Sequence, residues 1–344
     1  MKIWIISTGI FPCPPIGYSG LEMIAWQQAK GLAAKGHQVT LVAPEGSSIT
    51  DGYTLFPIKG NSGQFIGEKE SYGQYWKHLK DADVILDHSW EAWSAVGREE
   101  GWLKAPVLKI MHAPVDTMYK KMPPDKTLSF VCISQDQAAH FKALYNRDCR
   151  YCHNGVDVNY YRATGVPRSD RFLFLARFSS IKGPDICIEA CKKAGVSLDM
   201  IGDTQITNEP DLIHRCQEMS DGKQIRIIGN QTRSETVHWY SQAHCMIHPC
   251  KNFREPYGLA PVESQACGNP VAAWDNGAMR ETIKHGETGW LVKSMEELVE
   301  VIKNCSIDSA MRKRCREWVA SSFTIDMMIS RYEKLCEEAI QEPW

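Results

Sequence analysis

The sequence predicts an α/β protein built from two doubly wound domains, each with a mostly parallel sheet covered by helices on both faces. Two observations favour this fold class. Short apolar runs alternate with helix-length amphipathic stretches along nearly the whole chain of 344 residues. A chain of this length also suits two domains of ordinary size. Hydrophobic residues make up 43% of the chain and charged residues 23%, which excludes a disordered or fibrous protein.

The first series of elements fills the N-terminal half. An apolar run at 3–7 is followed by a turn rich in Pro and Gly, and apolar residues then recur at helical spacing between residues 21 and 36. A further helix is expected at 135–145. The buried strands of this series are expected at 3–7, 39–43, 84–87, 107–111 and 130–134.

The second series begins at residue 172, after a polar, turn-rich segment at 154–170 that we interpret as the linker. Strands are expected at 172–176, 198–201, 225–228, 245–248, 271–274 and 291–292. Helices are expected at 185–194, 234–243, 262–267, 295–304, 310–321 and 325–340. We therefore predict an N-terminal domain at 1–160, a C-terminal domain at 161–322 and a closing helix at 323–344. Doubly wound sheets bind ligands at the carboxyl ends of their strands, which places the expected site in a cleft where the two domains face each other.

Charge and targeting signals narrow the classes of function. The 39 Lys and Arg residues against 41 Asp and Glu give a net charge of -2, so no nucleic-acid partner is expected. The first apolar run is too short for a signal peptide, and no window approaches a membrane-spanning length. We expect a cytoplasmic protein, with peripheral membrane contact left open.

The thirteen cysteines are interpreted as reduced thiols, because a chain this long builds a core without disulfides. Cys149, Cys152 and His153 have no second Cys/His pair at the spacing of a zinc site. No metal site is expected.

Three segments carry candidate chemistry. In the first, 14–22, small residues open a helix, which allows a ligand close to the backbone and favours an anion at the helix start. Taken alone, it fits an ordinary strand-to-helix turn better. In the second, Arg177 and Lys182 follow a buried strand, and their two cations suit a diphosphate. Two solvated surface charges are an equally good explanation of that pair by itself.

The third segment places Glu255 in a loop after a strand and Glu263 on the helix that follows. The two are eight positions apart and would be separated by about 12 Å if the segment were wholly helical, whereas a retaining glycosidase needs its carboxyls about 5–5.5 Å apart. We interpret the pair as two carboxylates that bind different hydroxyl groups of one extended ligand, with a loop Glu and an unrelated helix Glu as the alternative.

Together these segments resemble glycosyltransferase family 4, retaining enzymes with the GT-B fold of two Rossmann-like domains. The resemblance covers nearly the full length. Its most specific block is Glu255-Pro-Tyr-Gly-Leu-x3-Glu263, followed by Gly-Asn-Pro-Val at 268–271. Glu255 follows Pro249 by six positions, a longer spacing found in a subset resembling antibiotic-pathway sugar transferases.

The resemblance implies a role for each matching residue. Arg177 and Lys182 would bind the donor diphosphate and stabilise the leaving charge, and Gly258 and Leu259 would donate backbone N–H groups to the same phosphates. Glu263 would hold the ribose hydroxyls, while Glu255 would contact the transferred sugar. Gly20 would lie against the donor from the opposite domain, and His112 matches the family's N-domain histidine near the sugar.

The implied function is metal-independent, retaining transfer of a hexose from a UDP- or GDP-linked sugar to a carbohydrate or other hydroxyl acceptor. No cofactor is expected besides the nucleotide-sugar donor. The alternatives are a non-catalytic nucleotide-sugar-binding protein and a nucleotide-sugar epimerase on the same fold. Among eleven tryptophans, Trp90, Trp93 and Trp102 fall where the family holds its acceptor, and one or two of them would stack on it. The sequence does not specify the base, the sugar, the acceptor, the linkage or the oligomeric state.

Overall fold

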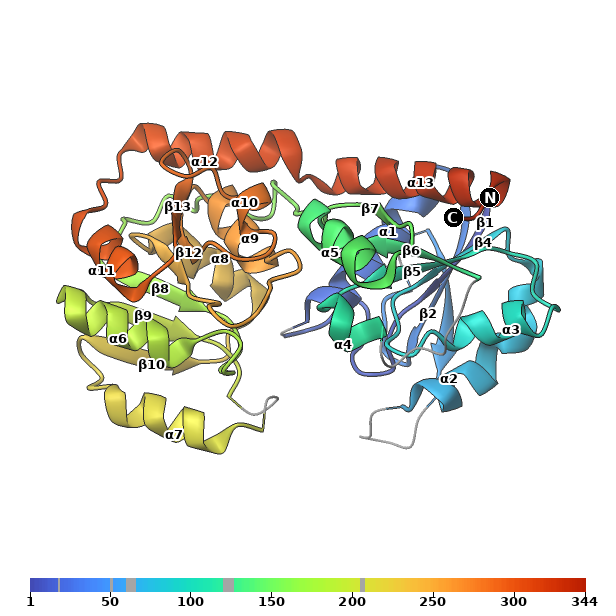
Figure 1. The fold of residues 1–344 in the computed structure, drawn as a ribbon, viewed down its shortest axis with the longest axis horizontal. Helices are drawn as coiled ribbons and strands as arrows, with labels where there is room; N and C mark the ends of the chain where they lie inside the picture. Colours follow the sequence, from blue (N-terminus) through green and yellow to red (C-terminus); the bar gives the residue numbers. More distant parts are fainter. Residues whose placement is uncertain (18, 50–51, 60–65, 120–126, 205–207) are drawn as a thin grey trace. The chain divides into compact units, whose positions relative to one another are not determined.

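The computed structural model describes residues 1–17, 19–49, 52–59, 66–119, 127–204 and 208–344. Tyr18 of the first candidate segment lies outside them. The chain forms two compact units (Figure 1). The N-terminal unit comprises Met1–Gly155 and Ile325–Trp344, and the C-terminal unit comprises Val156–Thr324. No helix within the described residues is both long and apolar enough to cross a bilayer.

The described part of the N-terminal unit contains a seven-stranded sheet in the order β3-β2-β1-β4-β5-β6-β7, in which every pair is parallel. Its strands are β1 (Lys2–Ile6), β2 (Gln38–Pro44), β3 (Thr54–Ile58), β4 (Val84–Asp87), β5 (Val107–Met111), β6 (Leu128–Cys132) and β7 (Arg150–Tyr151). Its helices are α1 (Gly20–Ala34), α2 (Glu68–Tyr75), η1 (Trp76–Asp81), η2 (Trp93–Ala95), α3 (Val96–Glu99), α4 (Val115–Tyr119), α5 (Gln135–Tyr145) and α13 (Ile325–Gln341).

The described part of the C-terminal unit contains a six-stranded parallel sheet in the order β10-β9-β8-β11-β12-β13. Its strands are β8 (Phe172–Leu175), β9 (Leu198–Ile201), β10 (Ile225–Gly229), β11 (Met246–His248), β12 (Val271–Trp274) and β13 (Gly289–Val292). Its helices are α6 (Pro184–Ala194), α7 (Pro210–Met219), α8 (Arg233–Gln242), α9 (Leu259–Ala266), α10 (Met279–Thr282), α11 (Met295–Asn304) and α12 (Ser309–Ser322).

Both sheets are doubly wound, as predicted. The strand order reverses between β1 and β4 in one sheet and between β8 and β11 in the other. Loops that leave two strands on either side of such a reversal diverge and leave room for a ligand. Gly20 follows β1, Arg177 and Lys182 follow β8 and Glu255 follows β11, so the topology brings these candidate residues to the ligand-binding edge of each sheet, while His112 follows the next strand, β5.

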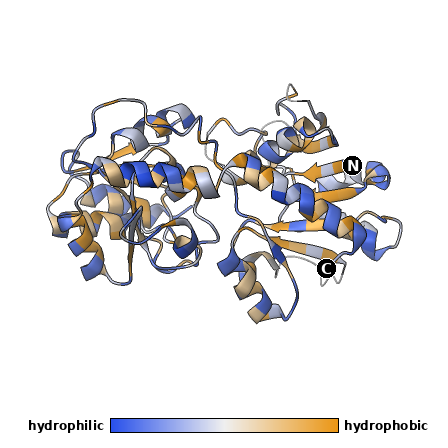
Figure 2. Ribbon diagram, turned by 90° about the horizontal axis from the view of Figure 1, so that it is seen from above, coloured by the Kyte–Doolittle hydropathy of each residue, from blue (hydrophilic) through white to orange (hydrophobic). Residues whose placement is uncertain are grey.

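Each sheet is buried in its own hydrophobic core. Phe130 and Phe141 pack at 4.9 Å between ring centroids in the N-terminal core, and Phe174 and Phe178 at 5.7 Å in the C-terminal core. Figure 2 shows the hydrophobic colour concentrated in the strands, while the long helices carry both colours. This is the pattern expected of helices that cover a sheet with one face and meet water with the other.

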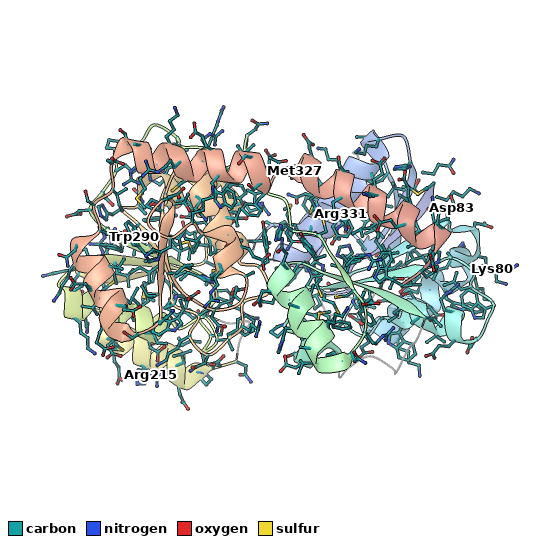
Figure 3. All side chains as sticks on the ribbon, turned by 45° about the horizontal axis from the view of Figure 1, so that its top comes forward. Lys80, Asp83, Arg215, Trp290, Met327 and Arg331 are labelled. Atoms are coloured by element: carbon teal, nitrogen blue, oxygen red, sulfur yellow. The ribbon has the colours of Figure 1, made fainter. Side chains whose placement is uncertain are left out.

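Helix α13 closes the N-terminal unit by packing on α1, and Figure 3 labels Met327 and Arg331 on it. A Cβ on Gly31 of α1 would lie 2.5 Å from the Ile329 side chain, so the glycine permits close contact between the helices. Glu333 accepts hydrogen bonds from Lys35 at 2.7 Å and pairs with His37 at 2.9 Å. Apolar packing and a small ionic cluster together fix the helix on this unit.

The chain passes between the units at slightly different points from the expected 160 and 322. Val156 pairs with Thr324 and donates to the carbonyl of Phe323 at 2.8 Å. Arg316 of α12 donates to the carbonyls of Val158 and Tyr161. These contacts tie the polar segment after residue 155 to the C-terminal unit, although nothing in its composition distinguishes it from a linker.

The sequence-based prediction lacks β3, β7 and α7 and the short helices α2, η1, η2, α3, α4 and α10; β3 and α7 are the longest strand and the longest helix among them. Strand β3 contains Pro57, which lacks an N–H donor and suits only an edge strand, where β3 lies. Helix α7 has Leu212, Ile213, Cys216 and Met219 at helical spacing on the face that packs in the C-terminal core, so its sequence carries a helical signal that the prediction missed.

Candidate active site

The loop between β8 and α6 carries the two predicted cations at the carboxyl end of β8. Gly183 caps α6 in the left-handed region, at φ 65, and Pro184 takes the first helical position. A Cβ on Gly183 would lie 2.7 Å from the carbonyl oxygen of Pro249. The loop that holds Arg177 and Lys182 is therefore packed directly against the loop that follows β11.

Lys182 and Glu255 meet where these two loops come together. The Lys182 ammonium donates a hydrogen bond to Oε2 of Glu255 and lies 4.9 Å from the centre of the Phe253 ring. The same oxygen is 3.2 Å from Nε2 of His248, the last residue of β11. Cys250 Sγ lies 3.2 Å from that nitrogen. The structure thus joins two of the predicted site residues directly and adds His248 and Cys250.

The pKa values of this cluster favour a carboxylate. Burial opposes ionisation of Glu255, but Lys182 and His248 outweigh it and hold the pKa of Glu255 well below its usual range. Burial lowers the pKa of His248 despite the neighbouring carboxylate, so its neutral form is favoured. Glu255 is therefore a charged acceptor that is suited to the hydroxyl groups of a ligand.

The side chains of His248, Cys250 and Glu255 are a group of possible metal ligands among the described residues, with ligand atoms all within 4.8 Å of one another. All three are buried. The Lys182 ammonium contacts the Glu255 oxygen that would bind a metal, so a metal ion there would have to displace an existing cation.

Arg177 lies near this cluster. Burial raises the pKa of the Cys250 thiol, and the charge of Arg177 offsets a small part of that rise. Nε of Arg177 is buried without a hydrogen-bond partner among the described residues. A buried donor with no acceptor costs about 1–3 kcal/mol. An anionic ligand would remove that cost.

The helix that follows Glu255 begins at the predicted glycine. Gly258 caps α9 at φ 82, and Leu259 is the first residue of the eight-residue helix. A Cβ on Gly258 would lie 2.5 Å from Cε of Met279 and 3.5 Å from Cγ of Glu255. The glycine therefore brings the start of the helix, with its backbone N–H groups, close to the Glu255 side chain.

Glu263, one turn further along α9, belongs to a separate polar group. Its Oε2 accepts a hydrogen bond from the buried Tyr240 hydroxyl at 3.1 Å. Arg233 donates to the Tyr161 hydroxyl at 2.8 Å, and its charge interacts favourably with Glu263. Glu263 remains partly exposed. Its carboxylate is oriented by neighbours and is still accessible to a ligand.

In the N-terminal unit, the turn after β1 is fixed by Glu22. This buried carboxylate accepts hydrogen bonds from Thr8, just past β1, and from Ser19 at the N-cap of α1. Burial raises the pKa of Glu22, and the Thr8 hydroxyl opposes part of that rise. Gly20, the predicted donor contact, is the first residue of α1 and is held in place by this group.

His112 follows β5 and is connected to His88, which follows β4. Nδ1 of His88 lies 2.7 Å from Nε2 of His112, and Nε2 of His88 lies 2.9 Å from Oε1 of Gln28. Gln137 of α5 donates to the carbonyls of Met111 and Ala113, which fixes the backbone on both sides of His112. Burial lowers the pKa of His112 to about 3, so the ring is neutral.

A buried ion pair lies beneath this histidine pair. Lys109 of β5 has its ammonium 3.7 Å from Asp87, at the end of β4, and donates to the carbonyls of Asp87 and Ser89. Asp87 also accepts hydrogen bonds from Ser89 and Ser94. The pair anchors the loop that presents His88.

The three tryptophans of interest differ in their surroundings. Trp102 packs on Gly97, where an added Cβ would lie 2.5 Å from the indole ring of Trp102. The ring centres of Trp102 and Trp76 are 5.4 Å apart. Trp90 is partly buried, and its backbone N–H donates to Glu68. Trp93 is partly exposed beside Tyr72 and Lys69. All three are partly buried; Trp90 and Trp102 pack against the N-terminal hydrophobic core, whereas Trp93 is not among the residues packed on it.

Two family models match consecutive parts of the chain. The model for glycosyltransferase family 4 matches residues 18–160, and the model for glycosyl transferases group 1 matches residues 164–320. Together they cover nearly the whole sequence. The chain is a glycosyltransferase of the family 4 type. The resemblance inferred from the sequence is thereby confirmed, and so is its assignment as an enzyme.

Two curated relatives of this glycosyltransferase share one name. The D-inositol 3-phosphate glycosyltransferase of Mycolicibacterium paratuberculosis is 24% identical over 309 residues, covering 76% of this chain and 68% of the relative. The enzyme of the same name from Mycobacterium tuberculosis is 26% identical over 253 residues, covering 62% and 51%. The matched segment thus spans about half the length of the latter.

Solved structures show the GT-B fold. AviGT4, a glycosyltransferase involved in avilamycin A biosynthesis, matches with a TM-score of 0.76 at 20% identity, over 99% of this chain and 98% of that one. Sucrose-phosphate synthase from Thermosynechococcus elongatus gives 0.82 at 16%, over 99% of each chain. Anabaena HepE in complex with UDP and glucose gives 0.76 at 17%, over 98% of this chain and 99% of that one. The predicted fold class is confirmed.

Proposed function

We propose that this glycosyltransferase moves a hexose from a UDP- or GDP-linked sugar to a hydroxyl acceptor, without a metal ion and with retention of the anomeric configuration. The observation that carries the proposal is the hydrogen bond between Lys182 and Glu255 at the strand-order reversal of the C-terminal sheet. It places a cation beside an ionised carboxylate at the edge where doubly wound sheets bind ligands.

In this proposal the cations receive the leaving diphosphate. An ammonium carries three N–H donors, so Lys182 can donate to Glu255 and to a phosphate oxygen together. Arg177 brings a buried guanidinium nitrogen without a partner among the described residues. The two side chains supply positive charge where negative charge develops, which is the usual way that an enzyme stabilises a departing anion. A metal ion is not needed for that task.

The carboxylates have separate tasks. Glu255 accepts hydrogen bonds from hydroxyls of the transferred sugar, because its ionised form is favoured. Glu263, oriented by Tyr240, accepts from the ribose hydroxyls. The leaving phosphate deprotonates the acceptor on the same face of the sugar, which retains the configuration. Anabaena HepE, which shares the fold, is solved with UDP and glucose, and this supports a UDP-linked donor.

Trp93 is the favoured contact for the acceptor. Its partly exposed ring lies in the N-terminal unit, which we assign to the acceptor, and an aromatic face suits the C–H groups of a sugar. Trp93→Ala would then raise the KM for the acceptor more than the KM for the donor.

The test begins with the donor. A thermal-shift screen of UDP, GDP and ADP identifies the base, because a ligand that binds the folded state raises its stability. The matching nucleotide sugars are then incubated with an acceptor panel in the presence of EDTA. We expect nucleotide release and a product with the donor's anomeric configuration by NMR. Activity that requires added metal, or an inverted product, would overturn the corresponding part of the proposal.

Variants test the residue roles. Lys182→Ala should reduce turnover by about 10²–10³-fold, the usual cost of removing one electrostatic stabiliser of a transition state. Glu263→Ala should mainly weaken nucleotide binding. Lys251→Ala is the matched control, because this exposed lysine lies 5.5 Å from the Trp274 ring, much as Lys182 lies against Phe253. Unchanged turnover in Lys182→Ala would refute the assignment.

A further inference from the structure

Gln28, His88 and His112 are linked in series in the N-terminal unit. Gln28 lies on α1, His88 follows β4 and His112 follows β5, so three separate elements meet in this chain of contacts. Gln28 and His88 are completely buried, while His112 as a residue is partly exposed. The series therefore runs from the interior of the unit to its surface and ends at His112.

The two imidazole rings meet edge to edge. Their planes differ by 22°, and their centroids are 4.9 Å apart. The 2.7 Å between the two nitrogens, together with the radii of the two rings, accounts for this separation. The rings are therefore nearly coplanar, and an N–H of one points along the lone pair of the other.

The direction of the protons follows from Gln28. Its Oε1 faces Nε2 of His88 at 2.9 Å, and a carbonyl oxygen can only accept, so Nε2 of His88 carries the proton. Nδ1 of a neutral His88 is then an acceptor. Nε2 of His112 must donate to it, which leaves Nδ1 of His112 without a proton. Both rings adopt the Nε2–H tautomer, the more stable form of neutral imidazole.

We propose that Gln28 and His88 are positioning residues that hold His112 in the Nε2–H tautomer, so that its Nδ1 accepts a hydrogen bond from a substrate hydroxyl. Nδ1 of His112 has no hydrogen-bond partner within the described residues. Burial and the neighbouring Lys109 lower the pKa of His112 to about 3, which keeps the ring neutral around pH 7.

The consequence for recognition rests on the proposed function. A His112 that can only accept at Nδ1 selects a ligand group that donates, such as the hydroxyl of a sugar. It would discriminate against a deoxy or O-methyl sugar at that position. A histidine free to exchange tautomers could either accept or donate at Nδ1 and would make this distinction less sharply.

The first experiment tests the tautomer without any substrate. The full chain is labelled with 15N-histidine, and two-bond 1H–15N spectra are recorded near pH 7. The signals of His112 are assigned with His112→Asn. We expect the Nε2–H pattern for His112 and for His88. The Nδ1–H pattern for His112, or averaged shifts, would overturn the proposal whether or not the enzyme uses a nucleotide sugar.

The second experiment tests the series itself. In His88→Phe, a residue of similar bulk replaces the acceptor, and the His112 nitrogens should move to the averaged shifts of an unrestrained neutral imidazole. Turnover should fall by about tenfold, the value of one hydrogen bond, while the KM for the nucleotide-sugar donor stays unchanged. His214→Gln, on exposed α7, is the control and should alter neither. If His112 keeps the Nε2–H pattern in His88→Phe, His88 has only a structural role.

Discussion

Gly277 lies directly against the backbone of Glu255. A Cβ on Gly277 would lie 2.3 Å from the carbonyl oxygen of Glu255 and 2.6 Å from its nitrogen. The neighbouring Ala278 donates its N–H to the same carbonyl at 2.9 Å. The turn after β12 therefore holds the backbone of the loop that carries Glu255 in position. Only a residue without a side chain allows the two backbones to come this close.

We predict that Gly277→Ala disturbs the site more than the fold. The methyl group has to push the Glu255 backbone away from α10, and a displacement of about 1 Å at a catalytic group costs about a hundredfold in rate. Turnover with the donor and acceptor identified in the screen measures this effect. The Lys182–Glu255 hydrogen bond would be lost or lengthened in a crystal structure of the variant.

Gly286→Ala is the matched control for that prediction. Gly286 has φ 79 and Gly277 has φ 60, so an alanine meets similar left-handed strain at either position, about 1–2 kcal/mol. Gly286 has no atom within 4 Å of the added Cβ. Equal losses of turnover in the two variants would mean that strain, and not contact with Glu255, is responsible.

The sequence predicts which candidate residues lie after the strand ends. Arg177 and Lys182 come directly after β8, and Glu255 and Glu263 flank the start of α9, so each is positioned by its own local element. Alternation of strands and helices then determines the sheet type, and the carboxyl ends of parallel strands meet at one edge. Local patterns are sufficient for these features.

The sequence does not predict the partners of these residues. Gly277 lies 22 positions after Glu255, and Gln28 lies 60 positions before His88, so no local pattern links either pair. A lone glycine or glutamine fits many other roles. The Asp-Asn-Gly turn at 275–277 was the one available signal of a tight turn there, and its contact with Glu255 depends on how β12 lies beside β11.

Lys109 should be essential for the stability of the N-terminal unit. Its side chain and that of Asp87 are fully buried, with 0% of each exposed. Lys109→Met removes the cation and leaves Asp87 as an unpaired buried charge, which costs about 3–5 kcal/mol. Hydrogen exchange followed by mass spectrometry should show faster exchange in β4 and β5, with the C-terminal unit unchanged.

Lys142→Met serves as the control, because Lys142 and Asp148 form an ion pair with 65% and 68% of their side chains exposed. Water replaces such an exposed partner with little effect on stability. Comparable acceleration of exchange in the two variants would mean that burial of the Asp87–Lys109 pair contributes nothing.

Tyr240 orients Glu263, and we predict that Tyr240→Phe weakens nucleotide binding without unfolding the protein. The variant removes one hydrogen bond to the carboxylate, worth about 1 kcal/mol, and the Kd should rise by about fivefold. Calorimetric titration with the nucleotide measures it. Tyr160→Phe is the control, because Tyr160 is exposed whereas Tyr240 is buried, and this variant should bind the nucleotide with the Kd of the unchanged protein. An unaltered Kd in Tyr240→Phe would mean that Tyr240 does not contribute to nucleotide binding.

The pair Lys182–Glu255 should also make stability depend on pH. The pKa of Glu255 in the folded protein lies well below its usual range, whereas in the unfolded chain a Glu has a pKa of about 4.3. Below that value the unfolded chain binds more protons at this position, so the pair's contribution is complete at neutral pH and is lost as the pH falls through the pKa of the folded state.

Lys182→Met removes the main cause of the low pKa of Glu255. We therefore expect the difference in denaturation temperature between the unchanged protein and Lys182→Met to be largest above about pH 5 and to shrink as the pH falls from about 4.3 toward about 3 in scanning calorimetry. Lys251→Met should show no such dependence. A difference that stays constant over this range would mean that Lys182 stabilises the fold by packing on Phe253 and not by charge.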